Sequence, residues 1–133
     1  MAYLSHRSLS FRALREANKK RLPEFKNKHG EIAHSKPDGS NWTPAQWLQA
    51  LVGELGEYAN IRKKFERGDL TGEEFHHLAA NELADVQIYL DILALQNNID
   101  LAAATINKFN IVSDRVGSSV YLDEDGDWYL KSS

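Results

Sequence analysis

The chain has 133 residues, of which 42% are hydrophobic and 26% charged, and its formal net charge at pH 7 is −3. This length suits one domain with a packed core, and the composition excludes a disordered chain. The charge gives no general attraction for nucleic-acid polymers or anionic membranes. The absence of cysteine excludes disulfides, thiolate zinc sites and cysteine nucleophiles. Since no stretch suits a signal peptide or a membrane span, we expect a soluble cytoplasmic protein.

The sequence predicts four helices, at about residues 8–21, 44–66, 72–97 and 101–116, and a short hairpin of 120–122 with 128–130. The second and third helices begin with capping boxes: Thr43 and Thr71 are the N-caps, and Gln46 and Glu74 are the third helical residues. Asp100 is expected to cap the fourth helix. These start signals are local, so the helix boundaries follow from a few residues each.

We therefore predict an all-α fold for the single domain 1–133, a four-helix bundle with a helical core at about 8–117. The tail, 118–133, is expected to form a short β-hairpin or an extended segment, and 27–41 is expected to be a loop. The third helix is apolar on almost every side, with Val86, Ile88, Leu90, Ile92 and Leu95. One small bundle does not cover so many directions, so we expect a homodimer or a dimer of dimers.

Two pairs of acidic residues lie on helix faces that are otherwise apolar. At about 100° per residue, Glu54 falls among the apolar residues of the second helix, Glu57 falls at their edge, and Glu82 and Asp85 fall inside the apolar face of the third. The i, i+3 spacing points both carboxylates of a pair the same way, so antiparallel helices can present two facing clamps. An unpaired buried carboxylate is costly, and few cations occupy matching positions. A divalent metal ion would satisfy all four.

Carboxylate ligands without cysteine or histidine suit Mg²⁺, with Mn²⁺ as a substitute, and disfavour Zn²⁺. The alternative is that the acids lie on solvated helix faces and only aid solubility, which is the common role of a single Glu-x-x-Glu. Two pairs on apolar faces make the metal site about as strong a hypothesis as this alternative. Composition and spacing leave both open.

The residues around the acidic pairs resemble the all-α nucleoside triphosphate pyrophosphohydrolases, the MazG-like group that includes dCTP pyrophosphatases. The resemblance covers about residues 45–117 and lies in Leu51–Glu57 (LVGELGE), Glu82–Leu90 (ELADVQIYL), and the segments 99–101, 108–110 and 113–117. It implies that Glu54, Glu57, Glu82 and Asp85 are the metal ligands and that Mg²⁺ is the cofactor. The family's asparagine four residues after its lysine is Val112 here, and Asn110 or Asp114 is the candidate to replace it.

The resemblance implies Mg²⁺-dependent attack of water on the α-phosphorus of a nucleoside triphosphate, which gives a nucleoside monophosphate and pyrophosphate. Glu57 is the expected base for the water, and Glu54 is the second candidate catalytic carboxylate. The candidate phosphate contacts are basic residues: Lys108, from the family motif, with Lys63, Lys64, Arg67 and Arg115.

Two tryptophans near the start of the second helix, Trp42 and Trp47, are candidates for stacking on a nucleobase. The alternative is that Trp47 belongs to the core and Trp42 anchors a loop. The expected role is nucleotide-pool sanitation or control. The competing hypotheses are a non-enzymatic helical dimer that acts as an adaptor or regulator, and a relative that hydrolyses phosphoribosyl-ATP or dUTP. The sequence does not decide the base or the sugar.

Overall fold

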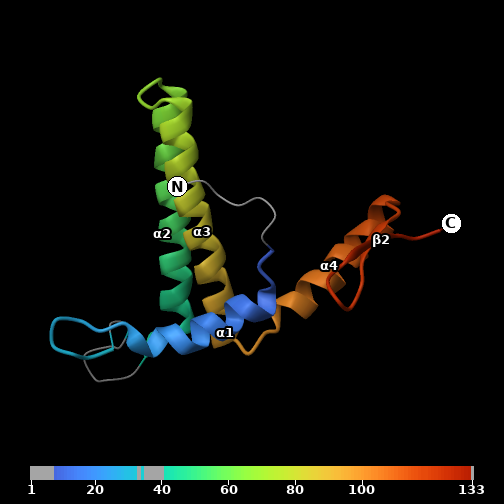
Figure 1. Ribbon diagram of the computed structural model, residues 1–133, viewed down its shortest axis with the longest axis horizontal. Coiled ribbons are helices and arrows are strands. Elements are labelled where there is room, and N and C mark those ends of the chain that lie inside the picture. The colour runs from blue at the N-terminus through green and yellow to red at the C-terminus, as the bar shows by residue number, and fades with distance from the viewer. Residues whose placement is uncertain (1–7, 33, 35–40, 133) are drawn as a thin grey trace.

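The structure, a computed structural model, describes residues 8–32, 34 and 41–132. Its helices are α1 (Phe11–Arg21), α2 (Pro44–Glu66), α3 (Gly72–Gln96) and α4 (Leu101–Val116), with a 3₁₀ turn, η1 (Leu22–Glu24), after α1 (Figure 1). The strands β1 (Val120–Leu122) and β2 (Trp128–Leu130) pair antiparallel, with Tyr121 opposite Tyr129. The predicted all-α class with a short C-terminal hairpin is confirmed. Much of the predicted loop 27–41, namely 33 and 35–40, lies outside the described residues.

The predicted helix starts are confirmed by their capping hydrogen bonds. The hydroxyls of Thr43 and Thr71 each accept a hydrogen bond from the backbone N–H three residues later. In return, side-chain oxygens of Gln46 and Glu74 accept one from the backbone N–H of the cap residue. Asp100 caps α4 through the N–H of Ala103 at 3.0 Å. Each cap pairs N–H groups that a helix start would otherwise leave without a partner. Because the capping residues stand at the helix start itself, the sequence predicts these boundaries closely.

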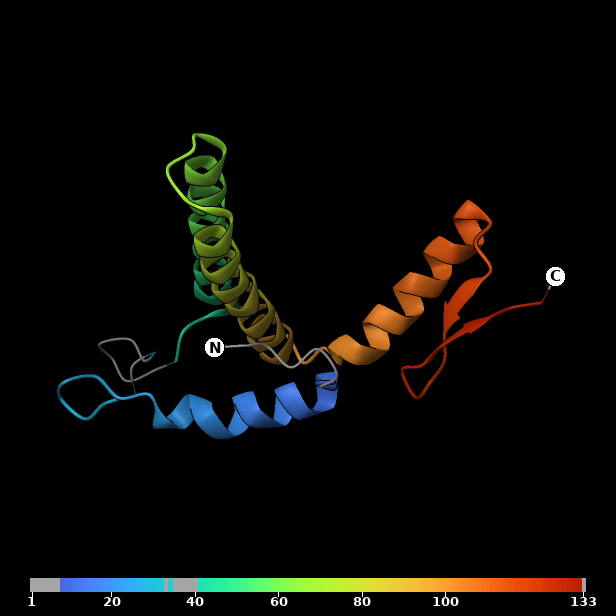
Figure 2. The same ribbon diagram turned by 45° about the horizontal axis from the view of Figure 1, so that its top comes forward.

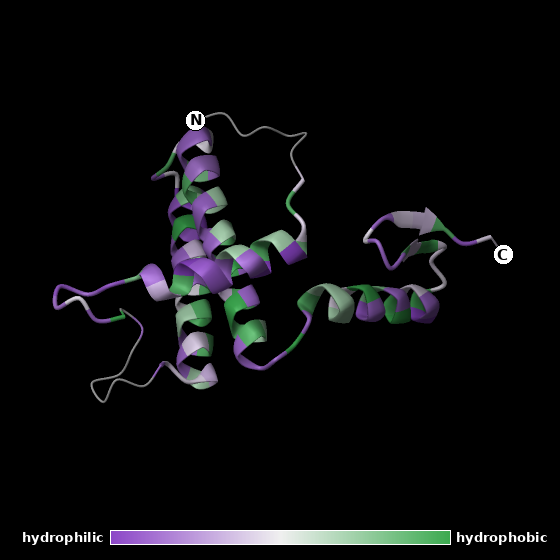
Figure 3. Cartoon of the chain, turned by 60° about the horizontal axis from the view of Figure 1, so that its bottom comes forward, coloured by the Kyte–Doolittle hydropathy of each residue, from purple (hydrophilic) through white to green (hydrophobic). Residues whose placement is uncertain are grey.

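Two of the helices form an antiparallel pair, a third lies across the end of this pair, and the fourth extends away from it. Helices α2 and α3 lie side by side and antiparallel, α1 crosses the C-terminal end of α3, and α4 extends away from the pair in both views (Figures 1 and 2). Helix α4 packs mainly against β1, and hydrophobic residues recur along it although it stands apart from the other helices (Figure 3). The four helices therefore do not close around one common core within a single chain.

The contact between α2 and α3 follows a repeat of alternating four- and three-residue steps. On α2 the buried and half-buried side chains of this repeat are Trp47, Leu51, Glu54, Tyr58, Ile61 and Phe65. On α3 they are Phe75, Ala79, Glu82, Val86 and Tyr89. Such a repeat keeps one stripe of each helix facing its neighbour, as in a coiled coil. Glu54 and Glu82 thus occupy positions that apolar residues take elsewhere along this contact.

The hairpin and α4 form one unit through side-chain hydrogen bonds. The Asn110 amide pairs with both backbone groups of Leu122 at 2.9 Å, and the Ser113 hydroxyl donates to the Val120 carbonyl at 2.6 Å. The Tyr121 hydroxyl donates to Asp114 at 2.7 Å. Asn110 and Asp114, the candidates to replace the family's asparagine, are therefore bonded to the hairpin. None of the described helices is long and apolar enough to cross a membrane.

Candidate metal centre

Three of the predicted ligands converge between α2 and α3. Glu54 of α2 and Glu82 and Asp85 of α3 each offer a carboxylate oxygen, and these oxygens lie within 4.8 Å of one another. All three side chains are half-buried. Opposite ligands of an octahedral Mg²⁺ lie about 4.2 Å apart, so this acidic cluster of Glu54, Glu82 and Asp85 has nearly the spacing that one ion requires.

The acidic cluster is electrostatically unfavourable without a cation. The pKa of Glu54 is raised to about 7, most strongly by burial, then by hydrogen bonding to the Glu82 carboxyl and by the charges of Asp85, Glu57 and Glu82. Oε2 of Glu82 is buried and has no hydrogen-bond partner among the described residues. A buried carboxylate oxygen with no donor is expensive, so the cluster fits a cation that accepts oxygen ligands.

The fourth predicted ligand, Glu57, lies beside this cluster rather than within it. Its side chain is exposed, and it is not one of the three residues whose oxygens converge. Its charge nevertheless acts on Glu54 one turn earlier on α2 and contributes to the raised pKa of that residue. The structure thus brings three carboxylates together and leaves the fourth at the solvent side. An oxygen-only donor set of this kind suits Mg²⁺ or Mn²⁺.

An aromatic group adjoins the acidic cluster. The rings of Trp42 and Trp47 lie 5.0 Å apart, and His34 lies 4.9 Å from each of them. Tyr89 joins this group to the carboxylates: its ring is 6.0 Å from that of Trp47, and burial, then the charges of Glu54 and Asp85, raise its pKa. We call His34, Trp42, Trp47 and Tyr89 the aromatic pocket.

A small cavity lies beside His34 and Trp47 of this group. It measures about 90 Å³ and is lined by Leu22, Pro23, Ile32, His34, Asn41, Trp47 and Gln96. Trp47 is buried in the core as well as facing this cavity, whereas Trp42 is half-buried. Trp47 precedes Glu54 by seven residues, about 10 Å along the axis of α2, and Tyr89 links the predicted stacking pair to the acidic cluster.

Three residues of this region were missed by the sequence analysis: His34, Tyr89 and Arg21. Burial lowers the pKa of His34, which keeps its ring neutral near pH 7. Arg21 acts on Tyr89 by lowering its pKa, and the guanidinium stacks 5.5 Å above the ring of Phe25. Tyr89 could be found from its seven-residue spacing to Glu82, which places both on the same face of α3. For His34 and Arg21 the sequence holds no signal, because their positions depend on how α1 crosses α3.

The predicted phosphate-binding residues lie at varied distances from the cluster. Lys63 and Lys64 are exposed near the end of α2, about 13 Å or more along the helix axis from Glu54. Arg67 forms an ion pair with Asp69 at 2.6 Å. Two further candidates, Lys108 and Arg115, are exposed on α4, which extends away from α2 and α3 (Figure 2). The structure does not bring these five side chains together.

Fold and site together define an all-α protein with a carboxylate cluster that could hold a metal ion, beside an aromatic pocket. No family model matches the sequence. The chain is similar to dCTP pyrophosphatase 1 of Rattus norvegicus, at 33% identity over 93 residues, which covers 67% of the chain and 55% of that protein. It is also similar to the protein of the same name from Mus musculus, at 32% over 107 residues, covering 77% and 63%, and from Homo sapiens, at 34% over 94 residues, covering 68% and 55%.

The family resemblance drawn from the two acidic motifs is confirmed by these relatives. The chain is related to dCTP pyrophosphatases, which are MazG-like nucleoside triphosphate pyrophosphohydrolases. It spans between about half and two thirds of the length of the relatives it matches.

Proposed function

We propose that the protein is a Mg²⁺-dependent nucleoside triphosphate pyrophosphohydrolase that converts a nucleoside or deoxynucleoside triphosphate and water into the monophosphate and pyrophosphate. The observation that carries this proposal is the convergence of Glu54, Glu82 and Asp85 within 4.8 Å, with Glu82 Oε2 buried and without a hydrogen-bond partner among the described residues. The similarity to dCTP pyrophosphatases supports the reaction class. Nucleotide-pool sanitation or control is the role that suits such a reaction.

The four carboxylates divide into three ligands and a base. Glu54, Glu82 and Asp85 would hold the ion, and Glu57 lies beside them on the solvent side. When bound, Mg²⁺ neutralises the triphosphate and lowers the pKa of a coordinated water. Glu57 is the candidate to accept a proton from the attacking water, because its side chain is exposed and lies outside the three-residue cluster. Glu54 is then free to serve as a ligand, since the ion compensates the charge that burial disfavours.

The base of the nucleotide is proposed to occupy the aromatic pocket. Indole faces stack on nucleobases without strong sequence preference, and Trp42 offers such a face at the edge of the pocket. Tyr89 adjoins both the pocket and the carboxylates, so a nucleotide with its base at Trp42 has its phosphates directed towards the acidic cluster. Arg21 adds positive charge near Tyr89 and is a candidate phosphate contact within the same chain.

A homodimer or a dimer of dimers is proposed because one chain leaves too much surface exposed. The chain exposes 9964 Å², whereas a folded monomer of its mass, 15.1 kDa, is expected to expose about 7,100 Å². When the fifteen residues outside the description are counted at the area of an unfolded chain, about 160 Å² each, about 7,600 Å² is left for the other 118 residues, against about 6,500 Å² for a folded monomer of their mass. The excess of about 1,100 Å² exceeds the area of about 800 Å² that each partner buries in a standard interface.

Part of this excess is apolar and continuous. Leu48, Val52 and Leu55 of α2 and Leu83 and Leu90 of α3 are all at least 36% exposed. Helical periodicity places all five on one side of the α2–α3 pair, the side away from Glu57 and Asp85. A second copy on this side would bury them and leave the acidic cluster open. Since α4 extends away from its own acidic cluster, Lys108 and Arg115 are proposed to contact the triphosphate from another copy.

The proposal is tested by incubating the protein with each common ribo- and deoxynucleoside triphosphate, dUTP and phosphoribosyl-ATP, with Mg²⁺ and with excess chelator. The expected result is release of pyrophosphate and the monophosphate in equal amounts, with dCTP among the substrates, and loss of both with chelator. Turnover of phosphoribosyl-ATP or dUTP alone would support the competing substrate hypotheses. If no compound turns over and Mg²⁺ does not raise the melting temperature, the enzyme proposal is overturned in favour of the non-enzymatic hypothesis.

A further inference from the structure

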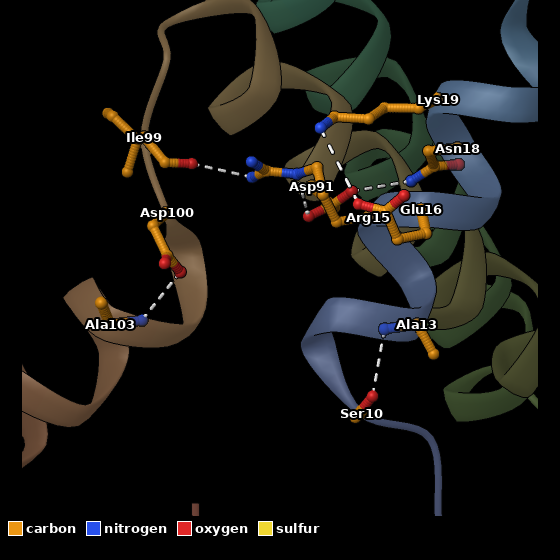
Figure 4. Close-up of polar contacts among 10 residues, drawn as sticks. All are labelled: Ser10, Ala13, Arg15, Glu16, Asn18, Lys19, Asp91, Ile99, Asp100 and Ala103. Carbon is orange, nitrogen blue, oxygen red and sulfur yellow. Dashed lines mark hydrogen bonds and ion pairs between the residues drawn. The ribbon is translucent and has the colours of Figure 1, made fainter. Parts of the chain in front are cut away.

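A buried acid outside the metal centre joins α1 to α3. Asp91 of α3 is only 2% exposed. Its Oδ1 accepts a hydrogen bond from Nε of Arg15 at 3.1 Å, and its Oδ2 accepts one from the amide of Asn18 at 2.9 Å (Figure 4). Both donors lie on α1, and Asn18 is itself buried. We call Arg15, Asn18 and Asp91 the polar joint.

The polar joint also holds the connection between α3 and α4. The guanidinium of Arg15 donates a second hydrogen bond to the carbonyl of Ile99 at 2.8 Å (Figure 4). The connection is short: Asn98 is left-handed, with φ 56°, and the N–H of Ile99 returns to the Ala94 carbonyl at 2.9 Å. This is a Schellman helix end with asparagine in the left-handed position. One side chain of α1 thus contacts both α3 and the turn that sets the direction of α4.

The other end of α1 carries residues of the proposed nucleotide site. Arg21, near Tyr89, follows Asn18 by three residues. Leu22 and Pro23 follow directly and line the 90 Å³ cavity together with Trp47 and His34. Since helix α1 and η1 are continuous in the chain, the place where Asn18 and Arg15 bind Asp91 also determines where this cavity wall lies.

Stability alone does not explain a charged joint at this place. Well-packed apolar residues of similar volume often stabilise as much as a buried ion pair, whereas a pair with fixed partners selects one arrangement among several. An apolar contact would let α1 slide or rotate over α3. The Arg15 contact prevents this movement, because Nε and a terminal nitrogen of the planar guanidinium donate to two different acceptors, Asp91 and the carbonyl of Ile99.

We propose that Asp91 is a positioning residue: through Arg15 and Asn18 it fixes α1 and the α3–α4 turn on α3, and so sets the cavity wall relative to the acidic cluster. The functional part of this inference rests on the proposed nucleotide site. Asp91 itself lies outside the acidic cluster, and its partners lie on α1 and in the turn. Its loss therefore affects nucleotide binding, and leaves the cluster between α2 and α3 intact.

Two variants test the joint. Arg15→Lys keeps a charge for Asp91, but one ammonium does not reproduce the fixed fork to Asp91 and Ile99. The triple variant Asp91→Leu, Arg15→Met, Asn18→Leu replaces the joint by apolar contacts of similar volume and leaves no unpaired buried charge. The matched control is Arg12→Lys, because Arg12 is one turn earlier on α1 and lines the same 450 Å³ cavity between α1 and α4 as Arg15. Hydrogen exchange, Mn²⁺ affinity and steady-state kinetics are measured for all three.

In Arg15→Lys we expect KM for the best substrate to rise about tenfold, the effect of losing one hydrogen bond to a charged group. The change in kcat and in Mn²⁺ affinity is expected to stay within about twofold. Arg12→Lys is expected to match the wild type in every measurement. An unchanged KM in Arg15→Lys, or an equal loss of Mn²⁺ affinity, overturns the positioning role. If the triple variant does not fold, Arg15→Lys alone decides.

Hydrogen exchange separates this inference from the proposed function. If the joint fixes α1, the amides of α1 and η1 exchange about tenfold faster in Arg15→Lys while those at the middle of α2 and α3 are unchanged. Unchanged exchange in α1 overturns the inference whether or not the protein is an enzyme. A wild-type protein that turns over no nucleotide, with faster α1 exchange in the variant, overturns the proposed function and retains the joint.

Discussion

Lowering the pH from about 8 to about 6 is expected to weaken the binding of Mn²⁺ to the acidic cluster about tenfold. The reason is the raised pKa of Glu54, which is about 7 in the metal-free protein because of burial, hydrogen bonding to Glu82 and neighbouring negative charges. A carboxylate must lose its proton to bind a metal ion, so protons compete with Mn²⁺ below this pKa. Above it the competition disappears, and below it each pH unit costs about a factor of ten.

Isothermal titration calorimetry in two buffers of different ionisation enthalpy measures both the affinity and the protons released. One proton with a pKa of about 7 predicts release of about 0.9 proton near pH 6 and about 0.1 near pH 8. Glu54→Gln has no proton to release at this position, so its weaker binding is expected to lose the pH dependence. Equal affinity at both pH values in the wild type would refute the electrostatic account of the cluster.

The same pKa fixes the sign of the stability change with pH. The folded-state pKa of Glu54 lies above its ordinary value of 4.5, so the folded chain keeps a proton that the unfolded chain has released. The free energy of unfolding of the metal-free protein therefore falls as the pH rises from about 4.5 to about 7. Added Mn²⁺ is expected to raise the melting temperature more at high pH than at low pH. A metal-free melting temperature that rises over this window would contradict the assignment.

Three further predictions concern activity. Glu82→Ala is expected to lower turnover about a hundredfold or more while the fold and oligomer persist, because the cluster loses a carboxylate; exposed Glu73→Ala is the control, and retained turnover would remove Glu82 from the site. Trp42→Ala is expected to raise KM about tenfold through lost stacking, whereas exposed Trp128→Ala leaves KM unchanged; equal effects would argue against stacking. Lys108→Ala is expected to be inactive alone, but mixing it with Glu82→Ala under subunit exchange restores about one quarter of wild-type activity. No recovery would exclude contact from another copy.

The helices of this protein are predictable because their signals are local. Thr43, Thr71 and Asp100 form their capping bonds within three residues along the chain, so no tertiary information is needed to place the starts of α2, α3 and α4. The placement of Glu54 and Glu82 among apolar residues follows equally from helical periodicity. The structure adds that their carboxylates meet, together with that of Asp85.

Periodicity was less informative where a helix carries more than one apolar face. On α2, Leu48 and Leu55 are apolar like Leu51 and Trp47, yet they are 49% and 45% exposed because α3 packs against the neighbouring face. The sequence predicts apolar stripes and does not tell which of them meets a partner in the same chain. The exposed stripe is where the expectation of a second copy applies.

The direction of α4 and the aromatic pocket lie beyond sequence reasoning for a related reason. The α3–α4 turn depends on Arg15, which is 84 residues away from Ile99, and the pocket depends on where α1 carries Arg21 and η1. Such contacts join segments that no local motif connects. The predicted phosphate role of Lys108 likewise depends on where α4 lies, and it stays a prediction.

The most direct test of the central claim is the position of a bound ion. Crystals grown with Mn²⁺ and a non-hydrolysable deoxynucleoside triphosphate analogue, measured at the manganese edge, locate the metal by anomalous scattering. Manganese is expected to be bound by Glu54, Glu82 and Asp85, with Glu57 beside it and phosphate oxygens completing the coordination. Manganese found only elsewhere, or an acidic cluster that stays without metal at saturating Mn²⁺, would contradict it.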